Sequence, residues 1–327
     1  MKTYIYPTYT PSRDKSGNEY IKYFHESFQK SSLFDQTNRL WKLGVASLFF
    51  NLDADLFVIQ WVDLIPFKRL GKLQFLLFLI AIWLLHLFRE KKILWILHNK
   101  HSHRGKSKLV DWGMRVLAQN SDCVIAHSSE GVSFFNENYP RSKGKCTYLP
   151  HPIYRSDIYE SLNAKWDYVI WGGISRRKMV AEFLNFARDN QFFAGKKILI
   201  CGNCSDKEYD SLIQKELWED VTYINRFIKD DELRRLISQS KCILFTYNTD
   251  SLLSSGALIY SLNFCKPIIG PKSGNFFDLR DIVSCYDKFE DIPLLKAFDN
   301  RKAIIEYINE NTWDRFPWKV YNIIGHY

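Results

Sequence analysis

The sequence predicts an α/β fold with two doubly wound domains in tandem. Short, continuously apolar runs recur along the whole chain, and each is followed by a stretch in which apolar residues have helical spacing. Strands that are apolar throughout are typical of parallel sheets covered by helices on both faces. With 327 residues and 46% hydrophobic content, the chain is long enough for two such domains.

The first predicted domain, residues 1–153, begins with a short strand, a polar loop and a helix, and the same alternation then repeats. The predicted strands are Thr3–Tyr6, Asp55–Trp61, Lys91–Asn99 and 122–128, and the predicted helices are Glu19–Lys30, Leu73–Phe88 and Ser107–Gln119.

The second predicted domain, residues 154–327, restarts the alternation after a stretch without clean periodicity at Pro150–Tyr168. Its predicted strands are WDYVIWGG, KKILICG, VTYIN, CILFTY and KPIIG, and its predicted helices are Lys178–Asn190, Asp206–Leu217, 230–240 and Ser254–Phe264. The last segment, residues 300–324, is helical in its first part and could pack back on the first domain.

The excess of positive charge is confined to the first domain. The whole chain has 45 Lys and Arg against 36 Asp and Glu; up to Ile153 the counts are 21 and 12, and from Tyr154 onward they are 24 and 24. The basic half is expected to meet an anionic partner, either membrane phospholipid, a lipid-linked phosphate or nucleic acid. Nucleic acid is disfavoured, because zinc-finger spacing, an aromatic ribonucleoprotein motif and a run of five basic residues are all missing.

The cysteines and the N-terminus predict a cytoplasmic protein. Seven scattered cysteines do not form the framework of a small secreted domain. The first residues, MKTYIYPTYT, have no apolar signal-peptide region.

The apolar segment Leu73–Phe88 is 16 residues long, which is short of the ~20 needed to cross a bilayer. It is bracketed by Lys72 and Arg89 and contains Trp83. Two interpretations stay open: a helix buried in the core, or a helix that dips into one leaflet of the inner face of the cell membrane.

Four loops of the second domain are candidate parts of a diphosphate site, because each follows a predicted strand. A helix start bares backbone N–H groups and the positive end of the helix dipole, and neighbouring cations add to this field. The alternatives are an ordinary serine cap and a solvated basic turn. The candidate nucleotide-binding residues are Arg176, Arg177, Lys178, Gly202, Asn203, Arg226, Phe227, Ile228, Asp250, Ser254, Ser255 and Gly256. Among them, Arg226 to Ile228 could offer backbone groups to a nucleobase.

The segments WGGISRRK, ICGNC, VTYINRFIKDDELRRLISQS and SSGALIYSLNFCKPIIGPKSG resemble, in this order, the donor domain of GT-B glycosyltransferases of bacterial capsule and exopolysaccharide biosynthesis. The first half, in DLFVIQW, KKILWILHNKHSH and YLPHPIY, resembles their acceptor domain. The resemblance implies two Rossmann-like domains that face each other across a cleft. It also implies transfer of a sugar from a nucleotide sugar, most favourably a UDP-sugar, to a lipid-linked or oligosaccharide acceptor, with no cofactor and no metal.

Within this resemblance, Lys178 matches the family's diphosphate lysine, but the arginine usually found before it is replaced by Gly173. The paired glutamates of the large retaining families are replaced by Leu252 and Tyr260. Asp250 and Asp278 are the nearby candidates for a ribose partner, and inversion against retention stays open.

The histidines of the first domain are candidate catalytic groups. His98 directly follows the strand ILWIL, and His103 lies in the same loop. An imidazole there could bind donor hydroxyls, or take the proton of an acceptor hydroxyl if the reaction inverts. Asn18 and Asn99 are assigned to the acceptor-side loops.

The prediction is therefore a glycosyltransferase associated peripherally with an anionic membrane. Two alternatives are a nucleotide-sugar 2-epimerase on the same fold and a non-catalytic GT-B-like subunit.

Overall fold

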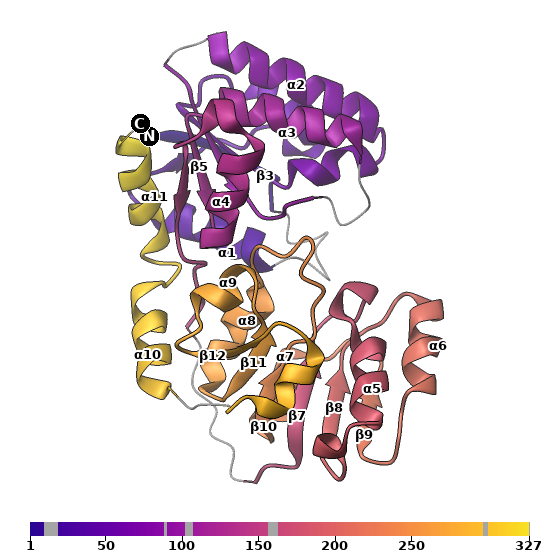
Figure 1. Cartoon of the computed structure of the whole chain (residues 1–327). Helices are drawn as coiled ribbons and strands as arrows, with labels where there is room; N and C mark the ends of the chain where they lie inside the picture. Colours follow the sequence, from indigo (N-terminus) through magenta and orange to yellow (C-terminus); the bar gives the residue numbers. More distant parts are fainter. Residues whose placement is uncertain (10–18, 88–89, 102–106, 156–162, 297–299, 327) are drawn as a thin grey trace. The chain divides into compact units, whose positions relative to one another are not determined.

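The structure is a computed structural model that describes residues 1–9, 19–87, 90–101, 107–155, 163–296 and 300–326. The chain divides into two compact units, unit 1 of Met1–Tyr154 with Asn311–Tyr327 and unit 2 of Arg155–Glu310 (Figure 1). The C-terminal segment is therefore divided: residues up to Glu310 belong to unit 2, and those from Asn311 onward belong to unit 1. Each unit is a parallel sheet of six strands, so the predicted α/β class is confirmed.

The sheet of unit 1 has the strand order β2-β1-β3-β4-β5-β6, and all its pairs are parallel. The chain leaves β1 first toward β2 and then toward β3, so the topological switch point lies between β1 and β3. All five residues of β3 are buried, as expected for a strand covered on both faces. The strands are β1 (Lys2–Tyr6), β2 (Asp35–Gln36), β3 (Leu56–Gln60), β4 (Lys92–Leu97), β5 (Cys123–Ala126) and β6 (Cys146–Tyr148).

The C-terminal segment joins unit 1 through aromatic packing. Trp313 and Phe316 lie in one buried cluster with Phe24 and Phe28 of α1. The last segment is helical in its second part as well, as α11. The helices of unit 1 are α1 (Glu19–Lys30), η1 (Trp41–Phe50), η2 (Val62–Phe67), α2 (Gly71–Leu87), α3 (Lys108–Asn120), α4 (Ser129–Asn138), η3 (Pro140–Ser142) and α11 (Phe316–Gly325).

The sheet of unit 2 has the order β12-β11-β10-β7-β8-β9, which is the doubly wound order with its switch point between β7 and β10. Ligands of such sheets bind outside the carboxyl ends of the strands at this point. The strands are β7 (Trp166–Trp171), β8 (Ile198–Cys201), β9 (Val221–Ile224), β10 (Ser240–Leu244), β11 (Ile268–Pro271) and β12 (Val283–Tyr286).

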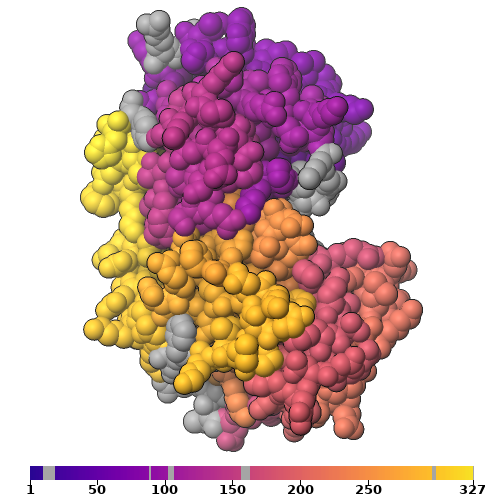
Figure 2. Space-filling view, viewed as in Figure 1, coloured from indigo at the N-terminus to yellow at the C-terminus, as the bar shows by residue number. Residues whose placement is uncertain are grey.

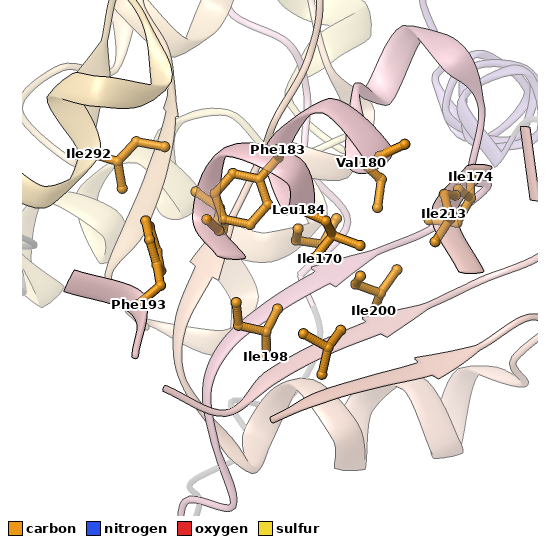
Figure 3. Packing of buried hydrophobic residues seen from close by; sticks show 14 of the residues in the cluster. Ile170, Ile174, Val180, Phe183, Leu184, Phe193, Ile198, Ile200, Ile213 and Ile292 are labelled. Carbon is orange, nitrogen blue, oxygen red and sulfur yellow. The ribbon is translucent and has the colours of Figure 1, made fainter. Parts of the chain in front are cut away.

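One face of this sheet carries a core in which α5 packs on the central strands. Figure 3 shows Phe183 and Leu184 of α5 over Ile170, Ile198 and Ile200. The predicted helix from Lys178 begins only at Val180, after Met179 in the left-handed region. The helices of unit 2 are η4 (Arg176–Lys178), α5 (Val180–Arg188), η5 (Gln191–Phe193), α6 (Lys207–Lys215), α7 (Asp230–Ser238), α8 (Gly256–Ser261), η6 (Leu262–Phe264), α9 (Gly274–Asp278), η7 (Phe289–Leu294) and α10 (Arg301–Glu310).

The apolar segment forms α2, a helix of 17 residues. Within the part of the chain that the structure describes, neither α2 nor any other helix has the length and apolar character needed to span a bilayer. One side of α2 is buried and the other is exposed, so neither of the two interpretations describes the whole helix.

Candidate functional site

The switch point of unit 2 holds a buried lysine. Lys178 follows β7 in η4 and is 5% exposed. Its Nζ donates a hydrogen bond to the carbonyl oxygen of Trp171, the last residue of β7. Nζ also lies 5.5 Å from the centroid of the Tyr247 ring, which follows β10. The lysine therefore joins the two strands that flank the switch point.

No carboxylate among the described residues balances the charge of Lys178. Burial lowers the pKa of the Lys178 amine and Arg177 lowers it further, whereas Tyr247 and Cys201 act in the opposite direction and do not cancel the effect of burial. In the described part of the chain, the amine has the Trp171 carbonyl and Tyr247 as neighbours, and no salt bridge. An unpaired buried cation is costly, and an anionic ligand would stabilise its protonated form.

Two glycines bring the first two strand-end loops of unit 2 into contact. Gly202 has φ of +147°, and a Cβ on it would lie 2.1 Å from the Gly172 oxygen. A Cβ on Gly172, whose φ is +90°, would lie 3.0 Å from Lys178 Nζ. The backbone oxygen of Asn203 accepts a hydrogen bond from Ile174 N (2.9 Å). Glycine at position 202 thus allows the two loops to touch, and glycine at position 172 leaves room beside the Lys178 amine.

The two predicted arginines differ in their partners. Arg177 lies over the same Tyr247 ring, with Cζ 5.4 Å from the centroid. Arg176 turns to α6, where Nε donates to Asp206 (2.9 Å) and Nη2 donates to Glu208 (2.5 Å). The hydrogen bond to Asp206 raises the pKa of Arg176 further. Only Arg177 is therefore grouped with Lys178.

The predicted base-binding loop follows the edge strand β9. Arg226 donates two hydrogen bonds to Glu232 of α7, at 2.8 and 2.6 Å, and is thereby held to that helix. Phe227 is exposed, while Ile228 is buried. An exposed aromatic ring beside a fixed arginine is a surface on which a planar base could stack.

The serine loop before α8 is capped as an ordinary helix start. The Ser255 hydroxyl accepts a hydrogen bond from Leu258 N (3.2 Å), so the capping interpretation holds for this residue. Ser254 is half-buried and Gly256 is exposed. α8 has only six residues.

Asn275 supports this loop and was not predicted as a site residue. Its Oδ1 accepts from Ser255 N (3.0 Å), and the side chain is 3% exposed. Its Nδ2 has no hydrogen-bond partner among the described residues. A buried amide donor without a partner is costly and indicates an unfilled polar contact. The sequence signal was weak, since Asn275 lies one residue beyond the start of a helix that was not predicted.

The carboxylates and the two replaced glutamate positions are spread around this loop. Asp250 is exposed, and its backbone N–H donates to Asn248 Oδ1 (2.8 Å). Asp278 is half-buried at the end of α9. Leu252 is buried, and the Tyr260 hydroxyl accepts from Arg234 Nε (3.4 Å). Either aspartate stays a candidate ribose partner.

In unit 1, His98 directly follows β4, the strand next to β3. Its ring stacks on Trp61, with centroids 3.9 Å apart and an interplanar angle of 1°. His98 Nε2 and Gln60 Oε1 are 3.0 Å apart. Because the amide oxygen can only accept, Nε2 carries the hydrogen and Nδ1 keeps its lone pair. The Gln60 Nε2 is buried and has no partner among the described residues.

Two more buried histidines lie close to His98 around the ring of Tyr20. The Tyr20 hydroxyl and His127 Nε2 are 2.7 Å apart, and His127 Nδ1 donates to the Leu149 oxygen (2.8 Å). The His127 and His151 centroids are 5.1 Å apart. Burial lowers the pKa of His127 to about 4 and that of His151 to about 3. It lowers the pKa of His98 well below its usual value, with further lowering from the other two rings. All three imidazoles are therefore neutral at pH 7.

Asn99 lies near the carboxylate of Asp63, which was not predicted as a site residue. Asn99 Nδ2 lies 3.4 Å from Asp63 Oδ2. Burial raises the pKa of Asp63 and lowers that of Lys68, whose Nζ lies 3.4 Å from the Tyr6 hydroxyl. Asp63 sits in the apolar stretch WVDLIPF, where a lone carboxylate directly after a strand is the available signal. Of the predicted site residues, Asn18 and His103 lie outside the described residues.

No group of three or more His, Cys, Asp or Glu side chains in the described ranges is placed to hold a metal ion.

Comparison with known proteins identifies the fold. No protein-family model and no curated protein sequence matches the chain. Among solved structures, Anabaena Alr3699/HepE in complex with UDP and glucose matches at 14% identity, with a TM-score of 0.58 over 96% of this chain and 92% of that chain. The lipopolysaccharide outer core galactosyltransferase WaaB matches at 13% identity, with a TM-score of 0.65 over 98% and 99% of the two chains. The fold is GT-B.

The GT-B fold by itself does not determine an activity. The N-terminal domain of trehalose-6-phosphate phosphatase from Candida albicans matches as well, at 11% identity and a TM-score of 0.67 over 99% and 96% of the two chains. Function must therefore be argued from the residues of this chain.

Proposed function

We propose that the protein is a glycosyltransferase that binds a nucleotide sugar, most favourably a UDP-sugar, at the switch point of unit 2. The observation that carries this proposal is the buried amine of Lys178, which has no carboxylate partner among the described residues. A diphosphate would supply the missing negative charge in a site of low dielectric, where the interaction is strong. Support also comes from the fold neighbour HepE, whose structure holds UDP and glucose.

The cations and amide donors of unit 2 suit a leaving diphosphate. Lys178 and Arg177 both lie close to the Tyr247 ring, and charge that develops on a diphosphate is stabilised by such fixed cations without a metal. We assign the unpartnered Nδ2 of Asn275 to a ligand oxygen. The loop with Arg226 and Phe227 is assigned to the nucleobase, by stacking and backbone contacts. We propose that no metal takes part.

Unit 1 is proposed to bind the acceptor. The lone pair on His98 Nδ1 can accept a hydrogen bond from a sugar hydroxyl, and the low pKa of the ring keeps it neutral for that role. If the reaction inverts, the acceptor oxygen attacks the anomeric carbon, the bond from that carbon to the phosphate oxygen breaks, and the acceptor proton passes to a base such as His98 or Asp63. His103, Asn18 and Asn99 stay candidates for the acceptor-binding part of the site.

We further propose that the acceptor is lipid-linked, that the product belongs to a surface polysaccharide, and that the protein associates with the inner face of an anionic membrane. The support is the charge of the first 153 residues, 21 Lys and Arg against 12 Asp and Glu. The fold neighbour WaaB acts on lipopolysaccharide by its name.

The proposal is tested by thermal unfolding with UDP, GDP, CDP and their sugars, followed by measurement of free nucleotide release with and without a chelator. A ligand at about a hundred times its dissociation constant stabilises the folded state by ~2.7 kcal/mol. We expect UDP to raise the unfolding midpoint, and UDP release from one UDP-sugar to continue with the chelator present. If no nucleoside diphosphate binds, the enzyme proposal fails. Binding without release or transfer would instead favour a non-catalytic subunit.

A further inference from the structure

The outer side of helix α2 is apolar and exposed. Its exposed large side chains are 41% to 57% accessible and recur every three or four residues, at Leu73, Leu76, Ile80, Trp83 and Leu87. This spacing places them in one stripe along the helix.

The opposite side of α2 is equally apolar but buried. It carries Phe75, Phe78, Ile82 and Leu85, all at 1% exposure or less. A helix that is apolar all round is found inside a protein core or against lipid. Among the described residues, only one side of α2 is covered by the rest of the protein. The exposed stripe is therefore an apolar surface available to a partner.

The elements beside α2 extend this exposed surface. Helix α3 lies beside α2 in Figure 1 and packs closely on it, since a Cβ on Gly113 would lie 2.1 Å from Phe75. The region coloured purple to magenta in Figure 2 carries these helices at the surface of unit 1. Eleven of the 21 exposed large hydrophobic side chains of the described residues fall between residues 40 and 112. With the stripe and Leu70 they include Leu109 and Trp112 of α3, and Leu40, Leu43 and Phe50 in or next to η1.

Basic residues border this apolar face. Residues 64–89 contain no Asp or Glu, and Arg69 and Lys72 are exposed at the start of α2. Lys42 of η1 and Lys108 of α3 are exposed as well. Asp111 is the acidic residue of α3. The face therefore combines apolar side chains, two tryptophans and a basic border, which is the composition of surfaces that lie in a membrane interface.

We propose that this apolar face docks on the surface of an anionic phospholipid bilayer. The stripe of α2 would enter the acyl boundary, with Trp83 and Trp112 at headgroup level and the lysines on lipid phosphates. A second copy of the chain fits less well, because a two-fold interface sets the same basic border against itself. This inference rests on the membrane association in the proposed function and gives it a location, but it is independent of the donor chemistry.

The test is flotation of the full chain with vesicles of phosphatidylcholine alone and of phosphatidylcholine with phosphatidylglycerol. We expect binding to the anionic vesicles that weakens as salt screens the headgroups. Trp83→Glu should lower the partition coefficient about tenfold or more, and Lys72→Gln about fivefold. The matched control is Trp318→Glu on α11 of the same unit, where the tryptophan is 60% exposed against 57% for Trp83. This control should bind like the unsubstituted protein.

Folding and donor binding are measured on the same samples. The exposed position of Trp83 predicts an unchanged unfolding midpoint, and Leu76→Gln is a milder second variant if the midpoint falls. Absence of vesicle binding, equal binding by the Trp83 and Trp318 variants, or a dimer in light scattering that Trp83→Glu dissociates would each overturn the proposal. UDP binding should be the same in both tryptophan variants. If the unsubstituted chain binds no UDP, that result counts against the donor site and leaves the vesicle result intact.

Discussion

The two units have related folds, but different charged and polar side chains lie near their switch points. In unit 2, the point between β7 and β10 holds a buried lysine and an arginine on one aromatic ring. In unit 1, the ends of β3 and β4 carry the amide of Gln60 and the neutral imidazole of His98, and the Asp63 carboxyl and the Lys68 amine lie near the same strand ends. All eight histidines of the chain lie in unit 1 and none lies in residues 155–310. The difference is that a carboxyl group lies near the lysine of unit 1, whereas the Lys178 amine of unit 2 has no carboxylate partner among the described residues.

Each unit also has one buried side-chain amide donor without a partner among the described residues, near the carboxyl ends of its strands. These donors are Nε2 of Gln60 at the end of β3 and Nδ2 of Asn275 after β11. Buried polar groups are normally satisfied, so both amides indicate places where a ligand or water completes the site.

The largest expected effect comes from removing the cation of unit 2. Lys178→Met should weaken UDP binding by about 3 kcal/mol, on the order of a hundredfold, because the diphosphate would face a buried site without its charge. The same substitution should leave the free protein as stable or make it more stable, since it removes an uncompensated buried amine. Calorimetric titration with UDP and thermal unfolding without ligand measure the two effects.

Lys266→Met is the matched control for this prediction. Lys266 is also a partly buried lysine of unit 2 with a pKa lowered by burial, but it precedes β11 and so lies at the amino end of the strands. Its substitution should leave UDP affinity unchanged. If both variants bind UDP like the unsubstituted chain, the switch point of unit 2 is not the anion site.

The histidines of unit 1 predict an acid-sensitive half of the molecule. The folded-state pKa values, about 4 for His127 and about 3 for His151, lie below the ~6.5 of an unfolded histidine. Above pH 6.5 both states are neutral and nothing changes. As the pH falls below 6.5 the unfolded chain binds protons first, so each group lowers the free energy of unfolding by about 2 kcal/mol at pH 5.

Hydrogen exchange of the full chain, corrected for the intrinsic pH dependence, resolves this effect by unit. Protection in β4 and β5 of unit 1 should fall between pH 7 and pH 5 by more than protection in β7 and β8 of unit 2. His127→Gln should reduce the difference. Equal losses in the two units would show that these imidazoles do not set the acid response.

The sequence predicted the strands that are apolar throughout, because burial on both faces leaves a signal in every residue. Lys178 and Arg177 could be named as candidates because cations directly after a strand and a glycine pair are a local pattern, and their role stays a prediction. Short elements with mixed composition, α9 and β12, were missed. Their stability comes from contacts far along the chain, such as the hydrogen bond from Asn275 N to the Leu253 oxygen (3.0 Å).

The hydrogen-bond partners of individual polar residues could not be predicted from the sequence either. That Arg176 is engaged by Asp206 and Glu208 depends on the start of α6 lying beside η4. That Asn275 and Gln60 are buried without a full set of partners depends on the packing around them. The sequence shows which residue types follow each predicted strand. The hydrogen-bond partners of each side chain depend on how the loops and helices pack in the folded protein.

The smallest expected effect separates the two arginines of unit 2. Arg177 lies on the Tyr247 ring beside the lysine, so Arg177→Met should weaken UDP binding about tenfold. Arg176 is held by two carboxylates at a half-exposed position, which already balance its charge, so Arg176→Met should change affinity by about threefold or less. Titration with UDP compares the two variants. The reverse order would mean that Arg176 leaves α6 when the donor binds, and the anion site of unit 2 would then be assembled by its ligand instead of being present beforehand.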